Sequence, residues 1–172
     1  AKPIYHKFVE QALALNPSHL LMIIPARWYA GGKGLDDFRN KMLTDKHLRH
    51  IEDYENASEV FPGVDIAGGV CYFLRSQSTP DEQNMCTIAN NVGRDRIEST
   101  RPTDEFDILI RQSQAIPIIR KVLAAENVSV NGDGSLSKTV SPRKPFGLAG
   151  NYKPKQTSKR GVPCHFTQSR GL

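Results

Sequence analysis

Two loops in the amino-acid sequence carry side chains suited to holding an anionic or planar ligand. The first places Arg27 and Trp28 directly after the apolar run His19–Pro25, and ligands bind at the carboxyl ends of strands in open α/β sheets. We therefore expect Arg27 and Trp28 to face a ligand or DNA, or Trp28 to cover the sheet edge instead. The second loop holds Phe61 between turn residues. A ring so placed either plugs the core or stacks on a planar ligand.

Other residues that could take part in chemistry lack the spacing that a known functional motif requires. The glycine-rich run 31–34 lacks the pattern of a phosphate-cradling or dinucleotide-binding loop, so it predicts a flexible loop with an accessible Lys33. His47, His50 and Asp53 have metal-ligating side chains, but on a strand the two histidines point to opposite sides. The sequence also lacks the Asp/Glu-x-Lys pair of metal-dependent nucleases and the Gly-x-Ser-x-Gly elbow of serine hydrolases.

The elements that must position these loops alternate between helix and strand. Apolar residues at helical spacing predict helices over residues 4–15, 35–43 and 114–125. The run His19–Pro25 predicts a strand buried on both faces of a parallel sheet. The expected inward side chains are Ile4, Phe8, Ala12 and Leu15 in the first helix and Leu35, Phe38 and Met42 in the second.

Further strand candidates follow the second helix. Residues 48–54 and 69–74 are separated by too little chain for a helical crossover, so we expect an antiparallel pair at one edge of the sheet. Residues 85–92 and 106–111 predict two more strands. Residues 134–172 contain five glycines and four prolines and indicate an extended linker or the irregular start of another domain.

Charge is distributed unevenly along the 172 residues, whose net charge is +5. Residues 134–172 carry eight basic side chains and no acidic one, whereas the first 133 residues carry 15 basic and 18 acidic side chains. This asymmetry predicts a slightly acidic domain followed by a segment that meets a polyanion, or a solvated tail. Three cysteines and no apolar run long enough to cross a bilayer favour a cytoplasmic protein with reduced thiols and no membrane partner.

Three stretches of the sequence together resemble a known enzyme family. They are Leu21-Met22-Ile23-Ile24-Pro25-Ala26-Arg27-Trp28, then residues 31–39, then Glu59-Val60-Phe61-Pro62-Gly63-Val64-Asp65 and its continuation to residue 73, with a weaker similarity over 141–148. These stretches are similar to the later half of adenine-specific DNA methyltransferases, in particular those of type II restriction-modification systems.

The resemblance implies an α/β fold: part of a Rossmann-like methyltransferase sheet with an antiparallel edge hairpin, followed by an irregular basic extension. In that family S-adenosylmethionine binds a glycine-rich loop, and an Asn/Asp-Pro-Pro-Tyr/Phe loop holds the target adenine. Neither loop occurs in this sequence. We therefore expect residues 1–128 to be the carboxyl half of a catalytic domain whose catalytic and cofactor loops lie upstream, and residues 129–172 to begin a target-recognition region.

The resemblance also implies roles for individual residues. Phe61 matches the aromatic position that stacks on an adenine flipped out of the duplex. Arg27, Lys33, Arg143 and Lys144 are candidates for contacts to double-stranded DNA, because positive charge supplies sequence-independent affinity. No residue is expected to bind the cofactor or a metal.

These expectations leave three functions to compare. The first is part of a site-specific DNA adenine-N6 methyltransferase, inactive as this segment alone. The second is a non-catalytic DNA-binding or specificity module whose basic tail contacts DNA, and the third is a structural α/β domain. The first also predicts self-association through the sheet edge that missing strands would cover.

Overall fold

The computed structural model describes residues 3–30, 34–77 and 83–126. The chain divides into two compact units, Ala1–Ile118 and Ile119–Leu172. Of the second unit the structure describes only the later turns of helix α3 (Ile116–Glu126). Lys33, Arg143, Lys144 and the region 129–172 therefore lie outside the described residues.

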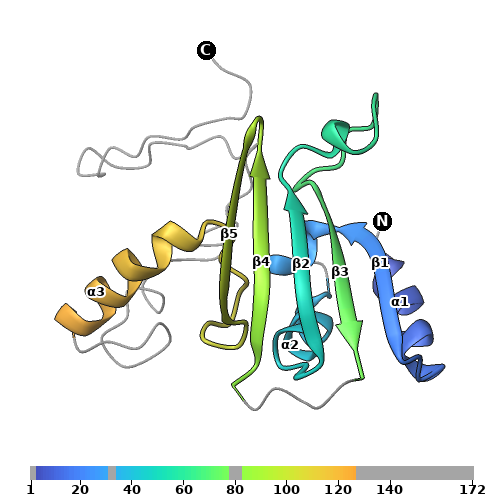
Figure 1. The fold of residues 1–172 in the computed structure, drawn as a ribbon, viewed down its shortest axis with the longest axis horizontal. Helices are drawn as coiled ribbons and strands as arrows, with labels where there is room; N and C mark the ends of the chain where they lie inside the picture. The colour runs from blue at the N-terminus through green and yellow to red at the C-terminus, as the bar shows by residue number, and fades with distance from the viewer. Residues whose placement is uncertain (1–2, 31–33, 78–82, 127–172) are drawn as a thin grey trace, which may run out of the picture. The chain divides into compact units, whose positions relative to one another are not determined.

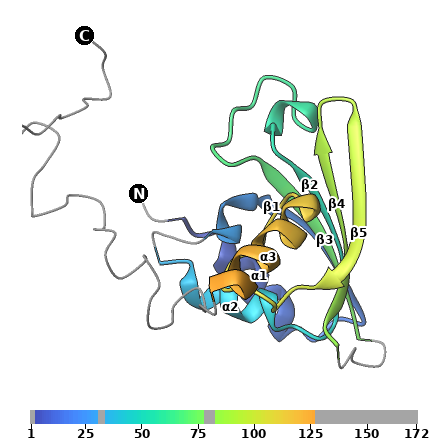
Figure 2. The same ribbon diagram turned by 90° about the vertical axis from the view of Figure 1, so that its left-hand side faces the viewer.

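The first unit is built on a five-stranded mixed sheet (Figure 1). The strands are β1 (His19–Pro25), β2 (Leu48–Tyr54), β3 (Val70–Ser76), β4 (Met85–Val92) and β5 (Asp95–Pro102), in the spatial order β1-β3-β2-β4-β5. Only β2 and β4 pair in parallel. Helices α1 (Tyr5–Ala14) and α2 (Asp36–Leu43) lie against one face of the sheet (Figure 2). The expected mixed α/β fold is confirmed.

The antiparallel pairing of β2 with β3 is confirmed, but its predicted place at the sheet edge is wrong. Strand β3 lies between β1 and β2 and pairs with both, and β4 continues the sheet beyond β2. The short connection fixes the direction of β3 relative to β2. It carries no information about which strands lie on either side of the pair.

Two predicted patterns of burial also fail, and both failures have the same cause. Strand β1 pairs antiparallel with β3, and Leu21 and Ile23 on its second face are exposed, so it is not buried on both faces. In α1 the inward side chains are Tyr5, Val9 and Leu13, whereas Ile4, Phe8 and Leu15 are exposed. Apolar spacing is present on two faces of each element, and only the packed layers decide which face is covered. The inward face predicted for α2 is confirmed, because Leu35, Phe38 and Met42 are buried.

Trp28 is fully buried rather than directed at a ligand. It lies on the 3₁₀ turn η1 (Ala26–Tyr29), with its ring 4.8 Å from that of Tyr29 and 6.0 Å from that of Phe38, both edge-to-face. Such aromatic pairs stabilise a core beyond the area they bury. The turn that follows β1 is therefore anchored by its two aromatic side chains.

The strand predicted at 106–111 is wrong, and strand β5 was missed. Residues 103–112 form an irregular segment, held where the backbone N–H of Leu109 donates to the carbonyl of Tyr29 at 2.9 Å. Strand β5 is mostly exposed and polar, so it lacks the apolar alternation that marks a half-buried strand. The helix predicted at 114–125 is confirmed as α3, preceded by the short turn η3 (Ser113–Ala115). Within the described ranges no helix has the length and apolar character needed to span a membrane.

Candidate functional site

A cleft of about 380 Å³ opens at the carboxyl end of β1. Half of its lining is alanine or glycine, so side chains do not fill it. The lining residues are Ala26, Arg27, Tyr29, Ala30, Ala67, Gly68, Leu109 and Arg111. We refer to this group as the two-arginine cleft.

Arg27 reaches the cleft from the turn η1. Its neighbours Ala26 and Trp28 are buried, and the backbone N–H of Ala26 donates to the carbonyl of Gly69 at 3.0 Å. Arg27 itself is exposed. The turn thus fixes the backbone and leaves the long cationic side chain of Arg27 in solvent, while a ligand-facing role for Arg27 stays a prediction.

Arg111 is the cleft residue that sequence reasoning missed. Its Nη2 donates to Asp53 Oδ1 at 3.0 Å and to the carbonyl oxygen of Gly68, and its guanidinium carbon lies 5.1 Å from the centre of the Tyr29 ring. The signal available in the sequence was Asp53, an acid two residues after Ile51 and therefore on the same face of the strand as that apolar side chain. A buried carboxylate requires a cationic or hydrogen-bonding partner, but nothing local identifies a partner 58 residues away.

Asp53 is the buried acid beneath the cleft, with 1% of its surface exposed. Besides Arg111 it accepts a hydrogen bond from Asn90 Nδ2 at 2.7 Å. Burial raises the pKa of Asp53, and the nearby charge of Arg111 opposes that increase. Burial also raises the pKa of the neighbouring Cys71 thiol to about 12. Cys71 is therefore protonated at neutral pH and is a core residue rather than a nucleophile.

Phe61 lies on the loop 55–69, which joins β2 to β3 at the same end of the sheet as the cleft (Figure 1). The loop begins with the turn η2 (Ala57–Glu59), and the backbone N–H of Phe61 donates to the carbonyl of Ala57 at 2.9 Å. The residue is 39% exposed. Phe61 is thus outside the buried core, and the core-plugging alternative is wrong.

The return of this loop into β3 is tightly constrained. Gly69 has φ +76, and a Cβ there would come within 2.0 Å of the Tyr54 carbonyl oxygen. Only glycine fits this position without backbone movement. Gly68 and Ala67, just before it, line the two-arginine cleft. One loop therefore carries both the exposed aromatic ring and part of the cleft wall.

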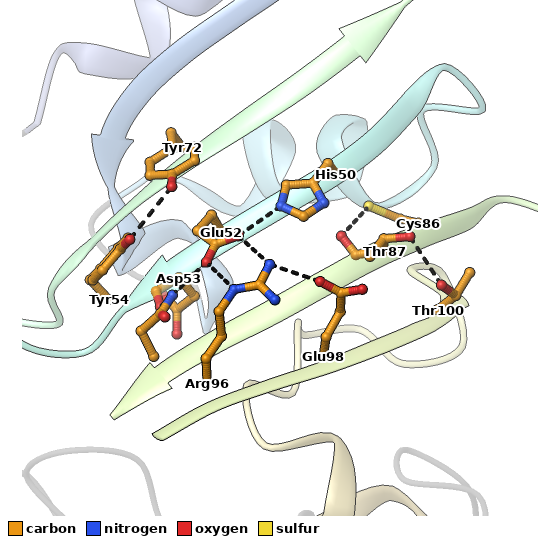
Figure 3. A network of polar contacts seen from close by, with 11 residues as sticks. His50, Glu52, Asp53, Tyr54, Tyr72, Cys86, Thr87, Arg96, Glu98 and Thr100 are labelled. Carbon is orange, nitrogen blue, oxygen red and sulfur yellow. Dashed lines mark hydrogen bonds and ion pairs between the residues drawn. The ribbon is translucent and has the colours of Figure 1, made fainter. Parts of the chain in front are cut away.

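A second polar cluster lies on the sheet face that the helices do not cover (Figure 3). At its centre Glu52, only 7% exposed, accepts two hydrogen bonds from Arg96, at 2.8 and 3.0 Å, and one each from His50 and Asn91, both at 2.8 Å. Arg96 also pairs with Glu98 at 2.7 Å. Burial alone would raise the pKa of Glu52, but these hydrogen bonds outweigh it and lower the pKa to about 2.

This second cluster holds strands together and is not a candidate site for a ligand or a reaction. Its members come from β2, β4 and β5, and each Glu52 oxygen is already paired. His50 takes part in it, whereas Asp53 faces the cleft side. Across the described ranges no three histidine, cysteine or acidic side chains gather as a potential metal site.

Comparison with known proteins finds a family match to the amino-terminal third of the chain. Residues 1–61 match the model of the Eco57I restriction-modification methylase family. A Mycoplasma pneumoniae protein described as an uncharacterized adenine-specific methylase is 36% identical over 75 residues, which is 43% of this chain and 18% of that protein. The matched stretch is thus about a fifth of the relative's length. Both matches support the resemblance to part of an adenine-specific DNA methyltransferase, and that recognition is confirmed.

Proposed function

We propose that this chain is a segment of an S-adenosylmethionine-dependent DNA adenine-N6 methyltransferase of a restriction-modification system. The observation that carries the proposal is Phe61, an exposed aromatic residue on a loop whose later residues, Ala67 and Gly68, line a cationic cleft. The loop sequence around Phe61 is the one that resembles the adenine-stacking loop of the family. A flipped base needs such a ring at the rim of the active site.

The two-arginine cleft offers no unpaired negative charge to the sulfonium group of the methyl donor, because its buried acid, Asp53, is already paired with Arg111. S-adenosylmethionine carries a sulfonium cation, and the cleft in this segment is lined by Arg27 and Arg111. Like charges in one cleft disfavour binding. We therefore place the cofactor on other parts of the protein and expect the 172-residue segment alone to transfer no methyl group to DNA.

Substitution of Phe61 tests the proposed function in the protein that carries this chain. Stacking on an aromatic ring is worth about 1–3 kcal/mol per base, so Phe61→Ala should lower methyl transfer from tritiated S-adenosylmethionine by roughly 5- to 150-fold. Phe61→Trp keeps a flat face and should retain most of the activity. The fluorescence of 2-aminopurine at the target position, which rises when that base leaves the stack, reports flipping directly.

A matched control lies on the same loop. Val64 is 42% exposed and is also apolar, so Val64→Ala should leave methyl transfer within about twofold of the unmodified protein. Equal losses for Phe61→Ala and Val64→Ala would mean that the loop, and not the ring, matters. Full activity of Phe61→Ala would contradict the stacking role.

The charge segregation favours a second candidate, a non-catalytic DNA-binding or specificity module. Its basic segment 134–172 would then supply most of the affinity. In that case salt-sensitive binding to duplex DNA survives Phe61→Ala and disappears when residues 134–172 are deleted. Under the leading proposal the same deletion weakens binding without changing the effect of Phe61→Ala on methyl transfer.

We further propose that the outer edge of β1 is a pairing edge. Among the described strands β1 pairs only with β3, and an edge with free backbone N–H and C=O groups is a template for another strand. The isolated segment should therefore self-associate. A single monomeric species in light scattering at 100 μM, a concentration of the order that favours edge pairing, would contradict this.

A further inference from the structure

The two-arginine cleft is the region whose chemistry the stacking role of Phe61 does not use. It has room for a small group, and its lining combines two guanidinium groups with alanine and glycine. Guanidinium groups in a fixed position favour phosphate and carboxylate oxygens, which they bind with two parallel hydrogen bonds. The lining therefore favours an anion.

Arg27 supplies the uncompensated charge of the cleft. Its guanidinium makes no hydrogen bond or ion pair with the residues that the structure describes, although its backbone is fixed by the buried turn η1. A long cation on an anchored backbone loses less freedom on binding than one on a mobile loop. Arg27 is thus available to a ligand without first breaking an internal contact.

Arg111 supplies a fixed donor surface but little net charge. Asp53 neutralises it at 3.0 Å, and the Tyr29 ring supports its guanidinium from one side. Its side chain remains 24% exposed. Arg27, Arg111 and Asp53 together carry one net positive charge, which matches the single negative charge of a phosphodiester.

The cleft is joined to Phe61 through the chain itself. Ala67 and Gly68 line the cleft and belong to the loop 55–69 that carries the ring. Arg111 donates to the Gly68 carbonyl and to Asp53, the residue before the last one of β2. Both ends of the loop are therefore tied to the cleft.

We propose that the two-arginine cleft binds one backbone phosphodiester of the DNA strand whose base stacks on Phe61, with Arg27 as the charged partner and Arg111 as the positioning residue. This inference rests on the proposed function for the identity of the strand. The anion site itself does not depend on methyl transfer. Its role is to fix the backbone next to the flipped nucleotide, because phosphate contacts set the register of DNA on a protein.

The salt dependence of DNA binding measures the contact. Each phosphate contact adds about 0.9 to the slope of log Kd against log salt concentration. For the protein that carries this chain and a 30-base-pair duplex, Arg27→Ala should lower the slope by roughly 0.9, so that the loss of affinity between 50 and 200 mM salt is about threefold to fourfold smaller. Lys7→Ala removes another exposed cation, from α1, and should leave the slope unchanged.

A second experiment identifies the phosphate. Methylphosphonate linkages, which carry no charge, are placed one at a time around the target adenine. One position should weaken binding to the unmodified protein several-fold and have no further effect on Arg27→Ala. If no position loses its effect in Arg27→Ala, the phosphodiester contact is refuted.

Arg111→Lys tests the positioning role. Lysine keeps the charge beside Asp53 but cannot reach Gly68 and Asp53 with one planar group. We expect the 2-aminopurine signal of the flipped base to fall several-fold, whereas the melting temperature changes little. A melting temperature lowered to the extent that the protein is unfolded at the assay temperature would make Arg111 structural and overturn this part.

The outcomes separate the cleft from the proposed function. If Arg27→Ala changes the salt slope but Phe61→Ala leaves methyl transfer intact, the cleft binds phosphate and the stacking role fails. If adenosine monophosphate binds the unmodified protein and not Arg27→Ala, while the salt slope for duplex DNA is the same in both, the site takes a free phosphate monoester and the proposal for DNA is overturned. An equal change in slope for Arg27→Ala and Lys7→Ala would reduce the effect to overall charge and would also refute it.

Discussion

Glu52 and Asp53 are neighbours on β2, yet they face opposite sides of the sheet and sit in different kinds of surroundings. Glu52 lies on the face without helices, where Arg96, His50 and Asn91 satisfy both of its oxygens. Asp53 lies on the helix-covered face, where Arg111 and Asn90 are its partners. Each acid is paired with an arginine, but the pKa of Glu52 is lowered and that of Asp53 is raised.

The difference lies in what else each arginine does. Arg96 donates to both Glu52 and Glu98, so its charge is compensated within a cluster that joins three strands. Arg111 uses Nη2 for Asp53 and Gly68, and the exposed part of its side chain lines a cleft. A closed ion cluster serves the fold. An ion pair at the wall of a cleft can also position a ligand.

Loss of the buried acid should have the largest effect on stability. Asp53→Ala removes the carboxylate that pairs with Arg111 and accepts a hydrogen bond from Asn90, and removal of one member of a buried ion pair costs about 3–5 kcal/mol. Urea unfolding followed by circular dichroism measures the change in unfolding free energy. Asp53→Asn, which keeps a hydrogen-bonding group for Arg111, should cost clearly less. A loss below about 1 kcal/mol for Asp53→Ala would mean that the pair does not hold the cleft wall.

Glu52→Gln should have a smaller effect that depends on pH. The folded-state pKa of about 2 lies below the ordinary value of 4.5, so the ionised form is favoured by folding. The stability gained from Glu52 is complete above pH 4.5 and is lost as the pH falls toward 2. At pH 7 we expect a loss of roughly 1–3 kcal/mol for Glu52→Gln.

The same variant gives the control for that prediction. Unfolding free energies of Glu52→Gln and the unmodified protein should converge as the pH is lowered from 5 to 2.5. If the difference between them is the same throughout this window, the hydrogen bonds to Glu52 do not favour its charged form. Glu98→Gln, at a 48% exposed carboxylate of the same cluster, should show a weaker effect.

Arg27→Ala should have the smallest effect on stability. The side chain is exposed and makes no hydrogen bond or ion pair with the residues that the structure describes, so the change in unfolding free energy should stay within about 0.5 kcal/mol. Differential scanning calorimetry is sufficient to check this. A large loss would show that Arg27 belongs to the fold, and would remove the contrast between a structural cluster and a ligand-facing cleft.

The sequence was sufficient for elements whose signal is local. The positions of both helices of the first unit, the direction of β3 relative to β2 and the exposure of Arg27 follow from spacing and turn residues. The two-arginine cleft was only half predictable. Arg27 follows a recognisable strand, but Arg111 comes from an irregular segment that joins the site through Asp53, and contacts over such separations leave no periodic trace.

The same limit explains the errors in burial. Phe8 and Val9 are adjacent apolar residues of α1, and the helix turns only Val9 inward. Trp28 is of a residue type that often binds ligands, but its place in the core depends on Phe38 of helix α2. Which of two apolar faces is covered is decided by the neighbouring layer, not by the element itself.

The central place of β3 sets the order in which this sheet can form. Residues 19–54 leave the ribosome before β3 does, and within the described sheet neither β1 nor β2 has an antiparallel partner until residue 76 has emerged. Pairing Pro25 with Val70 closes a loop of 45 residues, and such non-local contacts slow folding. The apolar segment Leu20–Ile24 therefore stays unpaired until β3 has been synthesised, and during that time it is open to association with other chains.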